Sequence, residues 1–413
     1  GLGLVRIQGL TRFWERADTG RGGLGLRQSQ FLAGLYHTAL PWGMVILGEP
    51  GGIGVHLALT GGSAAPQGWQ KLLSAGFPGC TLSAGPDTQQ VLARFGGLPA
   101  IAALTGNPST GETDPNVRTP FLRLEPLIEA MSGTRWAYIV LAYPLPPAKV
   151  EQQVEKLARE EQETVSAFLR PGTSEQNNNP QAQHYVSLLQ AARRKSEEGR
   201  LSGMWDVQAY LMAQDSLVLA RGGQALAGSF AGPDSVPQPF RVRPCCIGPA
   251  RTGFRPPSTV LTTAEAAAVC QLPSKEFPGY VLQEPVTFSV SPPLVRGSQS
   301  VAIGCIMNDG ARTGNWFDVS LEDLAKHVLV AGVPGSGKTQ TCQYLLSQLW
   351  SEHNIPWLVV EPSTKTEYRR LAGSSLAGDL QIYTLGDETC APLRLNPLAI
   401  LPGVPVQSHI DAL

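Results

Sequence analysis

The chain has 413 residues, of which 42% are hydrophobic and only 16% are charged. This composition excludes a disordered protein, and the length suffices for about two to three domains. Lys and Arg number 32 against 33 Asp and Glu, a net charge of −1, which argues against a protein that coats nucleic acid with a basic surface. A small basic site inside a ring or channel stays compatible with this balance.

The cysteines and the hydropathy pattern indicate the compartment. The 7 cysteines form no C-x-x-C pair, which is typical of a reduced protein of the cytosol. The longest apolar run, 136–143, is far shorter than the roughly 20 residues of a membrane span, and no signal peptide opens the chain. We therefore expect a cytoplasmic protein without a membrane span. Because the sequence does not begin with Met, its natural start is expected upstream.

Residues 1–246 predict a mixed α+β N-terminal region whose role the sequence does not reveal. The loop PGTSEQNNNP at 171–180 marks a possible split of this region. Apolar periodicity and turn residues predict these elements in chain order: a hairpin over 44–59, a helix from about 63, a strand over 135–143, a helix over 148–169, a helix after 180, a strand over 203–215 and a helix over 216–230.

Three further segments are expected in the second part of the chain. Residues 247–280 are predicted as a Pro/Gly/Arg-rich linker with a short helix. Short strands that alternate with Gly and Pro over 281–320 predict a small β-barrel. From 321 to 413 the pattern changes to strand, loop, helix and strand, the order found at the start of an α/β domain.

The segment VLVAGVPGSGKTQTCQYLLSQLW contains the pattern G-x-x-x-x-G-K-[ST]. Glycines let consecutive amide N–H groups turn toward phosphate oxygens, and the following helix adds its positive N-terminus. The lysine of such a loop reaches the terminal phosphates of ATP, and its Thr hydroxyl holds Mg²⁺. The residues predicted to bind ATP are Gly332, Val333, Pro334, Gly335, Ser336, Gly337, Lys338, Thr339 and Gln340.

The flanking residues provide the context that this motif requires. An apolar stretch at 328–331 precedes the loop and predicts a buried strand. An amphipathic helix is predicted after the loop, and a second buried strand over 357–360 completes a right-handed βαβ unit. A chance Gly-rich turn is therefore a poor explanation of the motif. Residues 321–413 are predicted to be the N-terminal part of an α/β P-loop (RecA-like) ATPase domain.

Residues 317–396 resemble the start of the motor domain in HerA-like P-loop ATPases of the HerA/FtsK superfamily, close to those of conjugative type IV secretion. The resemblance lies in FDVSLEDLAKHVLVAGVPGSGKTQTCQYLLSQLW, IPWLVVEPSTKTEYRRL, IYTLGDE and LRLNPL. Residues 262–280, TTAEAAAVCQLPSKEFPGY, resemble the segment that precedes this motor in the conjugative relatives. The likeness is diffuse over the first 250 residues.

The resemblance implies a hexameric ATPase, a helicase-like hydrolase that translocates or remodels double-stranded DNA. A partner nuclease or other effector would fit a role in DNA processing, transfer or anti-phage defence. Lys338 and Thr339 correspond to the phosphate lysine and the Mg²⁺ ligand. Glu361 stands where the family has Asp, and Glu367 matches a family Glu, so both are candidate catalytic residues.

Two observations restrict this interpretation. Residues 339–413 contain no second apolar strand that ends in Asp-Glu, so the water-activating acid and an arginine finger are expected to be absent from this chain. The near-neutral charge also leaves an alternative open, an ATP-gated assembly scaffold or regulatory subunit that moves no DNA. The substrate DNA, the effector and the direction of movement stay undetermined.

Overall fold

A computed structural model shows how the chain folds into two compact units, residues 1–288 with 308–311, and residues 289–307 with 312–413. The structure describes these residues: 2–15, 23–60, 66–84, 88–110, 123–168, 179–232, 234–245, 257–284, 291, 299–308, 311–362, 366–386, 389–394, 396, 398–400 and 402–412.

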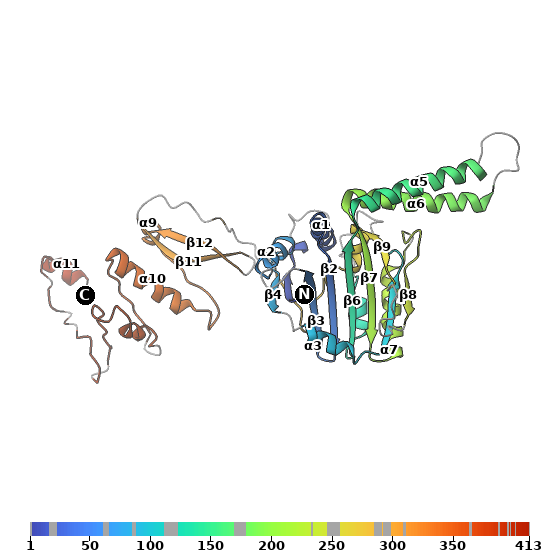
Figure 1. Cartoon of the computed structure of the whole chain (residues 1–413). Helices are drawn as coiled ribbons and strands as arrows, with labels where there is room; N and C mark the ends of the chain where they lie inside the picture. Colours follow the sequence, from blue (N-terminus) through green and yellow to red (C-terminus); the bar gives the residue numbers. More distant parts are fainter. Residues whose placement is uncertain are drawn as a thin grey trace. The chain divides into compact units, whose positions relative to one another are not determined.

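A ten-stranded sheet forms the centre of the first unit, in the order β10-β1-β3-β2-β6-β7-β5-β8, with β4 paired to β1 and β9 paired to β7 (Figure 1). Every pair is antiparallel except β1 with β10. The strands are β1 (Leu2–Thr11), β2 (Trp42–Glu49), β3 (Gly52–Thr60), β4 (Thr81–Ala84), β5 (Ala100–Thr105), β6 (Trp136–Pro144), β7 (Met204–Ala213), β8 (Arg241–Pro244), β9 (Thr259–Thr262) and β10 (Val281–Gln283).

Both faces of this sheet carry apolar side chains, because successive residues of a strand point to opposite sides. Met44 and Ile46 of β2 join the larger core, whereas Val45 and Leu47 join a smaller cluster on the other face. The larger core also receives side chains from α1 (Gly23–His37), α2 (Pro66–Gly76), α4 (Glu125–Ala130), α7 (Ser216–Phe230) and α8 (Thr263–Val269). The smaller cluster is covered by α3 (Thr88–Phe95).

Two long helices, α5 (Pro147–Phe168) and α6 (Pro180–Ser202), form an antiparallel hairpin that projects from one end of the sheet (Figure 1). The hairpin is inserted between β6 and β7, which are neighbours in the sheet. Hydrogen bonds from Tyr185 Oη and Gln190 Nε2 to glutamates of α5 hold the two helices together. The loop considered as a domain split therefore connects two helices that pack on each other, and residues 169–178 lie outside the described residues.

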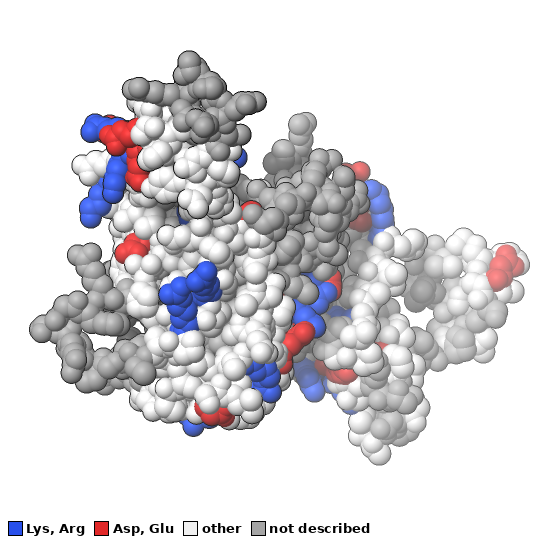
Figure 2. Space-filling view, turned by 90° about the vertical axis from the view of Figure 1, so that its right-hand side faces the viewer, with Lys and Arg blue, Asp and Glu red and all other residues white. Residues whose placement is uncertain are grey.

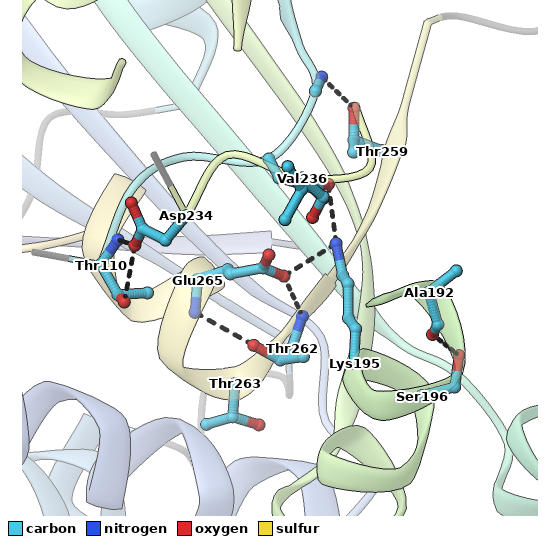
Figure 3. A network of polar contacts seen from close by, with 12 residues as sticks. Thr110, Ala192, Lys195, Ser196, Asp234, Val236, Thr259, Thr262, Thr263 and Glu265 are labelled. Atoms are coloured by element: carbon cyan, nitrogen blue, oxygen red, sulfur yellow. Dashed lines mark hydrogen bonds and ion pairs between the residues drawn. The ribbon is translucent and has the colours of Figure 1, made fainter. Parts of the chain in front are cut away.

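A buried polar network fixes the base of this hairpin to the sheet (Figure 3). Lys195 Nζ on α6 lies 2.9 Å from Glu265 Oε2 and donates to Asn107 Oδ1 at 2.7 Å. Glu265 in turn accepts from the backbone N–H of Thr262, whose hydroxyl caps α8. Desolvation lowers the pKa of Lys195, and the Glu265 carboxylate opposes that shift. The hairpin is thus attached through a paired charge rather than through apolar contacts alone.

The second unit contains a two-stranded sheet of β11 (Ser300–Asn308) and β12 (Ala311–Ser320). Its other elements are α9 (Leu321–Leu324), α10 (Lys338–His353), the 3-10 turn η2 (Tyr368–Gly373) and α11 (Val406–Asp411). The small β-barrel expected over 281–320 is not present in the described part of that segment, because β10 joins the ten-stranded sheet and β11 pairs with β12 alone. The mixed helix-and-strand character of the chain is confirmed, and the first unit contains the α+β arrangement expected of it, a large and mainly antiparallel sheet with helices.

Several elements agree closely with the sequence. The hairpin β2–β3, the strand β6, the long helix α5 and the helix α7 all occur where periodicity predicts them. The expected linker over 247–280 is more structured than predicted, since β9 pairs with β7 and α8 is buried in the core. Within the described residues, no helix is long and apolar enough to cross a membrane.

Candidate nucleotide-binding site

The phosphate-loop motif forms a turn that leads directly into α10. Gly335 and Gly337 have φ angles of 79° and 87°, in the left-handed region that residues with a Cβ rarely adopt. Gly337 is the N-cap of α10, so the helix begins at Lys338. These two glycines give the loop the curvature that directs its backbone toward one point.

Gly332 is required for a different reason. A Cβ built at this position would lie 2.5 Å from Ser336 Oγ and 3.6 Å from Lys338 Cγ. The loop therefore closes on itself so tightly that a methyl group at its first residue would collide with the serine. A Cβ at Gly335 or Gly337 would meet no such obstacle, so these two positions require glycine for their backbone conformation and not for space.

Lys338 lies inside the turn that these glycines make. Its Nζ donates hydrogen bonds to the carbonyl oxygens of Gly332 and Val333, both at 2.9 Å. The loop is open to solvent, and Val333 at its outer edge is 72% exposed. An ammonium held at the centre of an exposed loop by two neutral carbonyls can exchange these contacts for the stronger ones that an anion offers.

The rest of the second unit positions α10. Gln348 Nε2 donates to Ala302 O at 2.8 Å, and His353 Nε2 lies 3.1 Å from Ser300 O, so the helix is attached to β11 by side chains along its C-terminal half. The helix ends at His353, and its C-cap residue Asn354 has a left-handed backbone with a φ of 53°. The N-terminus of α10 is thus presented toward the loop with its positive end dipole.

The two candidate acids interact with each other and with α10. Glu361 Oε1 accepts from the backbone N–H of Glu367 at 2.8 Å, and Gln343 Nε2 of α10 donates to Glu367 O at 2.9 Å. Within the described residues, no hydrogen bond joins either glutamate to the phosphate loop. Sequence reasoning missed Gln343, because it lies outside the motif and only its position on the helix could have drawn attention to it.

Tyr368 and Cys342 connect η2 to α10 beside these glutamates. Burial and a hydrogen bond with Cys342 raise the pKa of Tyr368 to about 12, so the phenol stays protonated at neutral pH. The nearby carboxylates of Glu361 and Glu367 also raise the pKa of Tyr368. The contact between Tyr368 and Cys342 therefore helps to hold η2 against α10.

The strands expected on either side of α10 differ from prediction. Residues 328–331 and 357–360 form no strand, and within the described residues no other strand pairs with them. Their side chains are correspondingly open to solvent, with Leu329 89% and Leu358 88% exposed. A strand requires a neighbour for its backbone N–H and C=O groups, so an apolar stretch alone does not produce one. The βαβ unit is therefore absent from the described residues.

The donors present fit a bound triphosphate with Mg²⁺. The curved glycine turn, the central ammonium of Lys338 and the N-terminus of α10 all favour negative charge at one place. Thr339 lies in the first turn of α10, directly after Lys338, the position that the Mg²⁺-binding hydroxyl has in this motif. Among the described residues, no cluster of three or more His, Cys, Asp or Glu side chains offers a separate metal site.

Residues 303–403 match the family model of the central domain of helicase HerA. The resemblance to HerA-like P-loop ATPases of the HerA/FtsK superfamily is confirmed for this segment. It contains the whole phosphate loop, α10, Glu361 and Glu367, and a domain of this family indicates ATP binding and ATPase activity. No curated protein matches the chain.

Proposed function

We propose that this chain belongs to an ATP-hydrolysing ring motor that translocates or remodels double-stranded DNA together with a nuclease or other effector. The observation that carries the proposal is the phosphate loop centred on Lys338, inside a segment that matches the HerA central domain. The resemblance of this segment is the basis for proposing a hexamer and DNA as substrate, and the cysteine pattern is the basis for proposing a cytoplasmic location. The free thiols found at Cys305 and Cys342 are compatible with a reducing compartment.

Each loop residue has a role in this proposal. Lys338 would exchange its two carbonyl contacts for the terminal phosphates, while the backbone of 332–337 would surround the inner phosphates. Thr339 would hold Mg²⁺, which neutralises phosphate charge when it is bound, and Gln340 would flank the site. Glu361 and Glu367 would act by positioning η2 against α10 and by adding negative charge near the bound nucleotide.

A nucleotide-binding experiment tests the first step. Lys338→Ala should weaken the binding of a fluorescent ATP analogue by at least about tenfold, because a charge-assisted contact to the phosphates is lost. Lys149→Ala on α5 is the matched control, since this exposed lysine lies in the other unit. Equal affinity of the Lys338→Ala variant and the unchanged chain would refute the proposal.

The motor function requires a second measurement. ATP hydrolysis by the natural protein should rise when duplex DNA is added, and Lys338→Ala should abolish the increase. DNA affinity should fall as salt rises, because phosphate contacts release counterions. A particle mass near six protomers with an ATP analogue supports a ring, whereas a monomer under the same conditions contradicts it.

An ATP-gated assembly scaffold is the second candidate function, and the net charge of −1 favours it. In that case nucleotide would still bind through Lys338 and change the oligomeric state. DNA would neither stimulate hydrolysis nor bind in a salt-dependent way. The same set of experiments therefore separates the two functions.

A further inference from the structure

A polar cavity of about 470 Å³ lies in the first unit, beside the turn between β2 and β3. Its charged and polar lining consists of Arg6, Glu49, His56, Ser83 and Arg94, and the backbone of Gly52 and Gly279 contributes to the wall. This volume lies within the range of small-molecule sites in proteins.

The sheet register brings the polar side chains into one row. Arg6 of β1 is paired with His56 of β3 on one side and with Ser83 of β4 on the other. Directly opposed residues of antiparallel strands point to the same face of the sheet. Val45 of β2, the next partner of His56, belongs to the apolar cluster under α3, and this helix supplies Arg94. The cavity is thus formed by four strands and one helix.

Two polar atoms of this row are buried without a partner. His56 is 3% exposed, and its Nδ1 makes no hydrogen bond with any described residue. Arg6 Nε is likewise buried and without a partner. Buried nitrogens of this kind are rarely left unsatisfied in folded proteins, so two of them at one cavity indicate a ligand that accepts hydrogen bonds.

The charges at the cavity favour an anion. Arg94 is neutralised by Glu49, with a distance of 2.8 Å between Nη1 and Oε1. Arg6 has no carboxylate partner within the described residues, so the site has one positive charge in excess. Burial lowers the pKa of His56, and contacts with the backbone of Val45 and Gly54 oppose that shift. The guanidinium groups of Arg6 and Arg94 lower the pKa further. The imidazole is therefore neutral at pH 7, and its Nδ1 has no hydrogen-bond partner among the described residues.

We propose that this cavity is a binding site for a phosphate group, either inorganic phosphate or a small phosphomonoester, separate from the phosphate loop. Two guanidinium groups, an imidazole and the Ser83 hydroxyl offer more donors than the two oxygens of a carboxylate accept, and they match a tetrahedral oxyanion. A bound phosphate would satisfy both orphan nitrogens. Glu49 at the rim would compete with it for Arg94.

Calorimetric titration with inorganic phosphate tests the site in a Lys338→Ala background, so that the phosphate loop contributes little heat. Arg6→Gln should weaken binding about tenfold or more, because a buried charge-assisted contact is lost. Glu49→Gln should strengthen binding several-fold, since Arg94 then has no competing carboxylate. Arg221→Gln, an exposed arginine on α7, is the control of equal charge change and should leave the affinity unchanged.

The ring signals of His56 provide a local readout by NMR, assigned through His56→Gln. They should shift with phosphate in the Lys338→Ala chain and in the Glu49→Gln variant. A titration with a phosphomonoester such as phosphoserine distinguishes a site for a phosphorylated small molecule from one for the free ion. Absence of a shift at millimolar phosphate, or weaker binding after Glu49→Gln, would overturn the proposal.

Discussion

Single residues in the phosphate loop show how sequence constrains a site. Gly332, Gly335 and Gly337 are all predicted to bind phosphate, and the structure shows two different reasons for glycine at these positions. Gly335 and Gly337 have left-handed backbones, whereas Gly332 leaves room for Ser336 Oγ. The sequence alone cannot separate backbone strain from steric collision, because both requirements are met by the same residue type, glycine.

This distinction leads to a double-mutant prediction. Gly332→Ala should weaken binding of an ATP analogue, since the new Cβ would meet Ser336 Oγ at 2.5 Å. Adding Ser336→Ala removes that oxygen and should restore part of the affinity. Gly337→Ala, which would cost about 1–2 kcal/mol of left-handed strain, should not be rescued by the same change. Equal behaviour of the two glycine variants in the Ser336→Ala background would contradict this account.

His56 leads to a prediction about pH. Its pKa in the folded chain is lowered by burial and by Arg6 and Arg94, with Glu49 as the carboxylate nearby. A histidine in the unfolded chain has a pKa of about 6.5, so below this pH the imidazole is protonated in the unfolded chain but still neutral in the folded chain. The free energy of unfolding therefore falls as the pH falls. This loss of stability continues until the pH reaches the lower pKa that His56 has in the folded chain, and below that pH it stops.

The measurement is the urea midpoint of the first unit at pH 7.5 and at pH 5.5 in a buffer without phosphate. The unchanged chain should lose more stability between these two values than His56→Gln, whose glutamine does not titrate. His184→Gln, at an exposed position on α6, is the control and should keep the full pH dependence. An identical pH dependence of His56→Gln and the unchanged chain would show that this imidazole does not titrate differently on folding.

At the scale of elements, local patterns were sufficient wherever an element has its own partners. The helix α7 occurs over the predicted residues because Asp215 caps it and its apolar face packs on the core. The stretch at 357–360 has equal apolar character, but Leu358 and Val360 remain 88% and 84% exposed. A strand forms only when another strand, often distant in sequence, pairs with it. Apolar periodicity therefore predicts which residues favour an extended conformation, but not whether they join a sheet. The strand β10 is a second example, because it pairs with β1 at the opposite end of the first unit's sequence, and the short strands over 281–320 alone do not predict that partner.

The α5–α6 hairpin supports a prediction at this scale. Its base is fixed by Lys195 and Glu265, whereas the hydrogen bonds given for the described residues of its outer part, such as Tyr185 to Glu160, join α5 to α6. Replacing residues 163–188 by a short glycine-containing turn should therefore leave the sheet folded and change Tm by a few degrees at most. Far-UV circular dichroism should show the loss of helix.

A matched control distinguishes the outer part from the base. Lys195→Met leaves the Glu265 carboxylate, which is 10% exposed, without its ion-pair partner, and it should lower Tm markedly. If the shortened hairpin lowered Tm as much as Lys195→Met does, the outer part would have to stabilise the sheet. That result would refute the prediction that the base of the α5–α6 hairpin stabilises the sheet and its outer part does not.

At the scale of the whole molecule, buried apolar side chains are distributed unequally between the two units. The large buried clusters consist of residues from the first unit, whereas buried hydrophobic residues of the second unit are few, namely Val301, Ile306, Leu371 and Leu376 among the described residues. Stability depends mainly on apolar area removed from water. The two units should therefore unfold in separate transitions, and the second unit should unfold first.

Nucleotide binding provides the decisive test of this separation, because the phosphate loop belongs to the second unit alone. ATP with Mg²⁺ at about 100 times its Kd should stabilise that unit by about 2.7 kcal/mol and raise only the earlier transition. Differential scanning calorimetry would resolve the two transitions, and Lys338→Ala should remove the shift while leaving the later transition in place. A single transition that moves as a whole with nucleotide would mean that the two units unfold together, and that the loop reports on the stability of the entire chain.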